Sequence, residues 1–205
     1  TQSGGKTTSL SNTFTVTDNI TDIQVTAMHG ELVISPSQQV NTAEYVFPSH
    51  VNAFNDIRMN YEHSCVGACD TYDRVGYCRV KNHRGEWVEL YRYVTPFGVE
   101  CDADLDVSDY STVLQGLVEF EVYFQTWHGD GYNLTLTFNY PAGTPEYNYI
   151  DMNEIWFGAF DFGDYANQQP VPEVDFDFPF GTEKANLKII TTGHNWSSGV
   201  NGCYN

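Results

Sequence analysis

Short runs of alternating apolar and polar residues recur along this chain, each bounded by Gly, Asn, Pro or other turn residues. The clearest are Val118–Phe124 and Leu134–Phe138. Successive side chains of a β-strand point to opposite faces of the sheet, so this alternation predicts strands with one buried face. Further runs lie at residues 14–17, 23–26, 32–34, 57–61, 75–80, 87–94, 105–107, 155–160 and 187–192. Such closely spaced strands predict an all-β fold, an antiparallel eight-stranded jelly roll or β-sandwich.

Composition divides the chain into three parts. Residues 1–9 are rich in Thr, Ser and Gly and are expected to form a flexible lead-in. Residues 10–180 are predicted to form one jelly roll. Residues 181–205 are expected to begin a second jelly roll or to form a terminal extension. No signal peptide is visible at the start, so we interpret the chain as mature or trimmed.

The charge balance argues against two kinds of partner. The chain has 9 Lys and Arg against 27 Asp and Glu, which gives a net charge of −18. A field of this sign repels the phosphates of nucleic acids and of anionic lipids. No apolar run approaches the roughly 18 residues of a membrane-spanning helix. We therefore expect neither a nucleic acid nor a membrane as partner.

The cysteines predict disulfides. Cys65 and Cys69 bracket a tight turn, and no second Cys or His pair follows at zinc spacing, so a local disulfide is preferred to a metal site. Cys78 and Cys101 are predicted to form a second bridge between neighbouring strands. Cys203 is then unpaired, which suggests a partner beyond residue 205 or on another chain.

Disulfides of this kind indicate an oxidising compartment, so we expect a secreted protein, extracellular or on the cell surface. Three Asn-x-Ser/Thr sequons, at Asn19, Asn133 and Asn195, permit N-glycosylation.

The stretch at residues 65–74 presents acidic side chains beside a tyrosine and an arginine. Arg74 would keep a neighbouring carboxylate ionised, and Tyr72 could stack on a sugar or hydrogen-bond to it. The alternative is an Asp–Arg pair that only closes the start of a strand, and surface pairs of that kind contribute little to stability. The residues of this stretch alone favour the alternative.

An ordered series of motifs resembles the peptide-N-glycosidase F family over about three-quarters of the chain, from about Phe47 to His194. It includes Cys-Asp-x-Tyr-Asp-Arg at 69–74, Gly-Glu-Trp-Val-Glu-Leu at 85–90, Leu-Asp-Val-Ser-Asp-Tyr at 105–110, Tyr-Phe-Gln-Thr-Trp at 123–127 and Gly-Thr-Pro-Glu-Tyr-Asn-Tyr at 143–149. The resemblance implies a metal-independent and cofactor-independent amidase that cleaves N-glycans from asparagine. It also implies two jelly rolls side by side with the active site between them.

The resemblance also implies roles for individual residues. Asp73 matches the essential aspartate of the family, and Tyr72 stands where the family has tryptophan. Gln125, two residues before Trp127, replaces a glutamate, and an amide cannot exchange a proton at neutral pH. A further family glutamate falls on Asn205 or just beyond it.

Substrate binding is expected at Tyr72, Arg74, Gln125, Trp127 and His194, with N-glycans or glycoproteins as partners. An ordinary loop histidine is an equal alternative at His194, and a plain rim aromatic is a close one at Trp127.

Two functions compete at this point. The first is a glycoamidase that acts through Asp73, or the N-terminal chain of one completed by a second jelly-roll chain. The second is a non-catalytic extracellular jelly roll that binds glycans or assembles with copies of itself, which the amide at Gln125 favours. Copper-dependent peptide-amidating monooxygenases share the architecture but need clustered His and Met ligands, and the six histidines of this chain show no such pairing.

Overall fold

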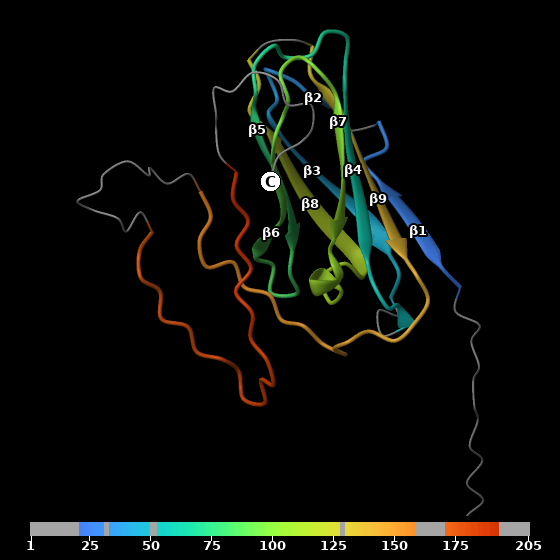
Figure 1. Cartoon of the computed structure of the whole chain (residues 1–205), viewed down its shortest axis with the longest axis vertical. Helices are drawn as coiled ribbons and strands as arrows, with labels where there is room; N and C mark the ends of the chain where they lie inside the picture. Colours follow the sequence, from blue (N-terminus) through green and yellow to red (C-terminus); the bar gives the residue numbers. More distant parts are fainter. Residues whose placement is uncertain (1–20, 31–32, 50–52, 128–129, 159–170, 193–205) are drawn as a thin grey trace, which may run out of the picture.

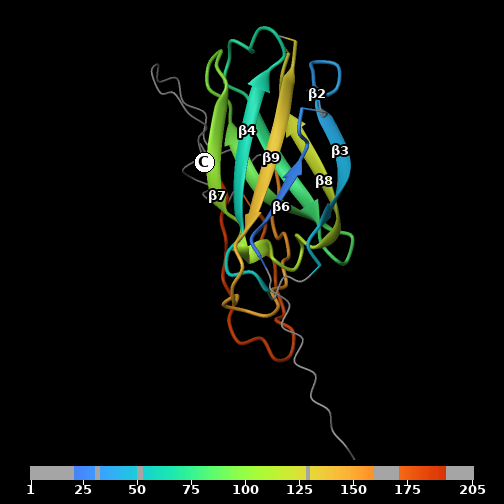
Figure 2. The ribbon, with the colours of Figure 1, turned by 90° about the vertical axis from the view of Figure 1, so that its right-hand side faces the viewer.

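The computed structural model describes residues 21–30, 33–49, 53–127, 130–158 and 171–192. They form a sandwich of two antiparallel sheets (Figures 1 and 2). The elements are β1 (Ile23–Ala27), β2 (Val33–Ile34), β3 (Val40–Phe47), β4 (Arg58–Cys65), β5 (Val75–Lys81), β6 (Trp87–Val94), β7 (Cys101–Asp106), the 3-10 turn η2 (Ser108–Tyr110), β8 (Gly116–Phe124) and β9 (Tyr132–Tyr140).

The strand order is that of a jelly roll. The first sheet has the order β1-β9-β4-β7, with the two-residue β2 also paired to β9, and the second has the order β3-β8-β5-β6. Figure 2 shows β7, β4, β9 and β1 side by side. From β3 to β9 every connection crosses between the sheets except the β5–β6 hairpin. The predicted all-β antiparallel jelly-roll fold is confirmed.

Aromatic side chains fill the space between the sheets. Alternate residues of β9 are buried, from Tyr132 to Tyr140. The rings of Tyr132 and Phe124 stack across the two sheets with centroids 4.7 Å apart, and those of Tyr61 and Tyr93 are also 4.7 Å apart. Burying one such side chain stabilises the fold by roughly 2 kcal/mol, so these rings hold the two sheets together.

The observed strands differ from the predicted ones at three places. β3 was not predicted. Residues 155–158 and 187–192 form no strand, because neither segment has a ladder partner within the described residues. The expected strand at 14–17 and the lead-in at 1–9 lie outside the described residues.

The cysteine pairing is partly corrected. The predicted Cys65–Cys69 disulfide is present. The predicted Cys78–Cys101 bridge is wrong, because Cys78 is a free, buried thiol on β5 of the second sheet while Cys101 begins β7 of the first sheet. Cys101 is disulfide-bonded to a partner that lies outside the described residues.

Residues 150–158 fasten the chain after β9 to the outer face of the second sheet (Figure 1, orange). Glu154 Oε1 accepts a hydrogen bond from Arg79 Nη2 at 2.7 Å, and the guanidinium of Arg79 lies 4.0 Å from the ring centroid of Phe157. Arg84 in the β5–β6 turn pairs with Asp151 at 2.8 Å. In the part of the chain that the structure describes, no helix has the length and apolar character needed to cross a membrane.

Candidate functional site

Two segments distant in sequence meet at one end of the second sheet. One is the connection between β4 and β5, residues 66–74, and the other is residues 125–127, which directly follow β8. β5 and β8 are neighbours in which Gly76 pairs with Phe124, and the Gln125 N–H donates to the Val75 carbonyl at 2.9 Å. The beginning of β5 and the end of β8 therefore lie together, which brings the predicted residues of both segments into one region.

The connection between β4 and β5 is held in shape at its base. The Cys65–Cys69 disulfide joins Cα atoms 5.1 Å apart. Between them, Gly67 has a φ of +76°, and a Cβ at this position would lie 2.4 Å from Asp130 Oδ2. Only glycine combines this backbone conformation with this close approach. The loop is thereby fixed directly before residues 70–74, which carry the functional side chains.

Asp70 is the most enclosed charged group of the site, with none of its side chain exposed. Its carboxylate accepts two hydrogen bonds from Arg74, at 2.7 Å from Nε and 3.1 Å from Nη2. The Tyr72 N–H and the Thr126 hydroxyl also donate to it, at 3.1 and 3.0 Å. Burial by itself raises the pKa of Asp70, but these hydrogen bonds and the charge of Arg74 outweigh it and lower the pKa to about 2.

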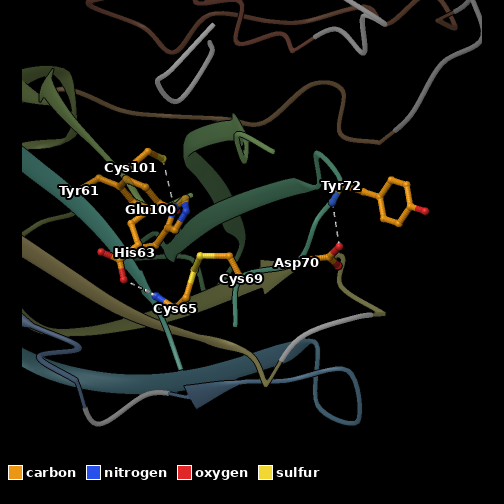
Figure 3. The surroundings of a disulfide bond; sticks show 8 residues. All are labelled: Tyr61, His63, Cys65, Cys69, Asp70, Tyr72, Glu100 and Cys101. Atoms are coloured by element: carbon orange, nitrogen blue, oxygen red, sulfur yellow. Dashed lines mark hydrogen bonds between the residues drawn. A yellow bond between two sulfur atoms is a disulfide. The ribbon is translucent and has the colours of Figure 1, made fainter. Parts of the chain in front are cut away.

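Arg74 lies between two exposed rings. The centre of its guanidinium is 5.2 Å from the ring centroid of Tyr72 and 4.6 Å from that of Trp127, within the range of cation–π attraction. The two residues are 53% and 56% exposed. Figure 3 shows Tyr72 projecting away from the disulfide, with its backbone N–H directed at Asp70. An apolar face flanking a cation in this way can stack on one face of a sugar ring.

Asp73 and Gln125 lie just beyond the ends of neighbouring strands. Asp73 precedes Val75, the first residue of β5, by two residues, and Gln125 follows Tyr123 of β8 by two; Val75 and Tyr123 lie on the outer face of the second sheet. Asp73 and Gln125 are both half-buried. Just along this face, the rings of Tyr77 and Tyr123 stack with centroids 5.0 Å apart. The catalytic role of Asp73 and the binding role of Gln125 stay predictions.

The structure thus brings together Tyr72, Arg74 and Trp127, and their roles in binding also stay predictions. The predicted His194 and the sequons at Asn19 and Asn195 lie outside the described residues. Asn133 is half-buried on β9, opposite Ser64 of β4.

Asp70 and Thr126 were missed as site residues. The Cys-Asp-x-Tyr-Asp-Arg motif offers two carboxylates near Arg74, and the alternative of a weak surface Asp–Arg pair is corrected because the pair is buried. The sequence offered no signal that selects Asp70 over Asp73, because the course of the loop decides which carboxylate reaches Arg74.

The described residues contain no group of three or more His, Cys, Asp or Glu side chains that could hold a metal ion. The site presents carboxylates, a guanidinium, an amide and aromatic rings.

Comparisons with known proteins agree with this fold. No protein-family profile matches the chain. It is 28% identical over 174 residues to peptide-N(4)-(N-acetyl-beta-D-glucosaminyl)asparagine amidase F of Elizabethkingia miricola, a match that covers 78% of the chain and 49% of that protein. PNGase F from Flavobacterium meningosepticum, described as a glycosylasparaginase, superposes with a TM-score of 0.59 and 27% identity over 63% of the chain and 45% of that structure.

A second structure of the amidase gives a TM-score of 0.58 and 28% identity, covering 62% of this chain and 44% of that one. Fold and site define the class, an antiparallel jelly roll with an aromatic and charged cluster at one end of a sheet. The predicted resemblance to the peptide-N-glycosidase F family is confirmed. The chain spans about half the length of the relatives that it matches.

Proposed function

We propose that this chain is the N-terminal jelly roll of a glycoamidase that hydrolyses the glycosylated asparagine side-chain amide and releases N-glycans. The observation that supports it best is the cluster of Tyr72, Arg74 and Trp127, in which Asp73 stands between Tyr72 and Arg74 in the sequence. The similarity to a named amidase over 78% of the chain supports this reaction class.

The reaction needs a base that activates water and a donor for the leaving nitrogen. Asp73 serves as the carboxylate that activates water. It lies two residues before β5 begins and directly precedes the cationic Arg74 in the sequence. Gln125 orients water or a sugar hydroxyl by hydrogen bonding, because an amide cannot act as a proton acid or base at neutral pH. A second acid must then come from residues that the described part of this chain does not supply. We propose that it belongs to a second jelly roll.

Exposed apolar side chains after β9 support a second covering layer. Phe178, Leu187 and Ile189 are 61%, 64% and 73% exposed. We propose that these side chains contact another protein surface. The prediction that residues 181–205 begin a second jelly roll, and that residues 10–180 form the first, fits this exposure.

The ligand class follows from the charges. Asp70 neutralises Arg74, so the two rings flank a pair with no net charge, within a chain of net charge −18. Such a surface favours a neutral sugar, such as N-acetylglucosamine, over an anionic one. We propose N-glycoproteins as partners and, from the Cys65–Cys69 disulfide, an oxidising extracellular setting.

The test is to incubate the purified protein with a denatured N-glycoprotein and to measure released glycan by mass spectrometry. Asp73→Asn should abolish release, whereas Asp104→Asn, an aspartate to asparagine change on β7, should leave it unchanged. Absence of release by the wild type when it is joined to its second jelly roll would contradict the amidase proposal. Sugar binding without release would instead support the non-catalytic glycan-binding alternative.

Gln125→Glu is a second test, because it supplies a group that can exchange a proton beside Asp73. Release by this variant should rise about tenfold over the unchanged protein at pH 6 to 7, as expected for an added general acid or base. An unchanged rate would show that Gln125 is remote from the reacting bond.

A further inference from the structure

We propose that Asp70 is a positioning residue of the site, which holds the rings of Tyr72 and Trp127 at their spacing through Arg74 and never touches the ligand. This inference rests on the proposed function for its ligand, a neutral N-acetylglucosamine sugar. Its structural part, the arrangement of the rings, stands on contacts within the chain.

Asp70 contacts both segments of the site at once. From its own segment it receives the Tyr72 N–H and the Arg74 guanidinium. From the segment after β8 it receives the Thr126 hydroxyl at 3.0 Å, and the Trp127 N–H lies 3.4 Å from the same oxygen, Oδ2. The carboxylate is therefore the group at which the two segments are tied together.

The backbone around Asp70 is held as well. The Asp70 carbonyl accepts a hydrogen bond from the Gly98 N–H at 3.0 Å, and the Thr95 N–H donates to the Arg74 carbonyl at 2.7 Å. The Arg74 N–H in turn donates to the Thr95 hydroxyl at 2.8 Å. Asp70 and Arg74 are thus fixed at both backbone and side chain, so the carboxylate has no freedom to follow a moving guanidinium.

The position of Arg74 depends on this carboxylate. Both Nε and Nη2 bind it, which fixes the plane of the guanidinium as well as its place. From this place the centre of the guanidinium lies 5.2 Å from the ring centroid of Tyr72 and 4.6 Å from that of Trp127, so it contacts both rings. Without the carboxylate, a buried cation has no counter-charge and moves toward water, and the rings lose the group between them.

The contrast with a second Asp–Arg pair shows why Asp70 is more than a surface partner. Asp104 also pairs with an arginine, Arg58, at 2.8 Å, but the two side chains are 64% and 44% exposed. The Asp70 and Arg74 side chains are 0% and 10% exposed. The exposed pair is screened by water, whereas the buried pair decides where its arginine lies. Asp104→Asn is therefore the matched control for Asp70→Asn.

The experiment compares these two variants by NMR and by titration with the N-acetylglucosamine disaccharide. In Asp70→Asn the backbone amide signals of Tyr72 and Trp127 and the Arg74 Nε–H signal should shift, and the dissociation constant should rise about tenfold, as for loss of a buried charged hydrogen bond. In glycan release, KM should rise more than kcat falls. Asp104→Asn should change none of these quantities.

Unchanged Tyr72, Arg74 and Trp127 signals in a folded Asp70→Asn variant would overturn the inference, as would an unchanged dissociation constant with shifted signals. If Asp70→Asn does not fold, Thr126→Val takes its place, because it removes one hydrogen bond and keeps the charge. In Thr126→Val the signals of Tyr72, Arg74 and Trp127 should shift in the same direction as in Asp70→Asn. Unshifted signals would again overturn the inference. If the wild type neither binds the sugar nor releases glycan, the proposed function fails while the NMR comparison still decides the role of Asp70.

Discussion

The two sheets share one core but present different outer faces. The outer face of the first sheet, along β9 and β4, carries small polar and charged residues: Asn133, Thr135, Thr137, Asn139, Arg58, Asn60, Glu62 and Ser64. The outer face of the second sheet carries Tyr77, Arg79, Arg92, Glu121 and Tyr123, and residues 150–158 lie on it.

Burial separates the two faces. The Arg79 side chain is 15% exposed, against 44% for Arg58. A face toward water needs only polar groups, but a face that carries a second layer must pair the charges it buries. The candidate site lies at the beginning of β5 and the end of β8, so it belongs to the second sheet, but its Tyr72 and Trp127 rings remain exposed.

The core common to both faces should be the most sensitive to acid. His63 on β4 is fully buried, and its Nδ1 shares a 2.9 Å hydrogen bond with the Tyr61 hydroxyl. Burial lowers the pKa of His63 to about 4, against a small opposing effect of the Val99 carbonyl and the charge of Glu100. As the pH falls, His63 therefore binds a proton in the unfolded chain at a higher pH than in the folded chain.

The stability that this difference contributes is complete above pH 6.5 and is lost as the pH falls to about 4. The loss is about 3 kcal/mol in the free energy of unfolding. Urea denaturation at several pH values measures it, and His63→Gln, which cannot titrate, should remove this part of the pH dependence. The same slope in both proteins would show that other groups cause it.

Removing one arginine from each face should separate the faces by stability. Arg79→Ala leaves Glu121 and Glu154 without their cation in a half-buried setting and should lower the free energy of unfolding by about 2 kcal/mol. Arg58→Ala removes an exposed pair and should change it by less than about 0.5 kcal/mol. If urea denaturation gave the two variants the same loss in free energy of unfolding, the two faces would not differ in how strongly their ion pairs stabilise the fold.

The smallest expected effect on stability concerns residues 150–158, which lie on the outer face of the second sheet. The Phe157 ring packs edge-on against Tyr77, with centroids 5.0 Å apart, and lies under the guanidinium groups of Arg79 and Arg92. Phe157→Ala should cost about 1 kcal/mol and should speed amide hydrogen exchange within 150–158 before the strands respond. Thr137→Ala on the first sheet should have no such local effect. Exchange that rises evenly over the whole sandwich would argue that the segment is part of the core.

Alternation in the sequence was enough to locate most of the strands. The run predicted at 87–94 coincides with β6, and those within β8 and β9 differ only at their ends. β3 was missed because its inward positions include Asn41 and Ala43, which weaken the apolar period. Alternation also cannot tell whether a strand finds a partner, which is why 187–192 was predicted as a strand.

The arrangement within the candidate site could not be predicted from the sequence. Tyr72, Arg74 and Trp127 lie close together in the structure, and their roles in binding stay predictions. Asp70 was overlooked because two aspartates stand near Arg74 in the sequence, and only the turn of the chain decides which one reaches the guanidinium. The Cys78–Cys101 prediction failed for a related reason, since sequence spacing does not show which sheet a strand joins.

The Thr126–Asp70 hydrogen bond spans 56 residues. Closing so long a separation requires β5 and β8 to be paired first, and contacts of this range form slowly because their loop-closure entropy precedes any gain. The contact between the two site segments therefore depends on the β5–β8 pairing. Ligand binding should report a sandwich in which these two strands are paired, and not only the presence of β-structure.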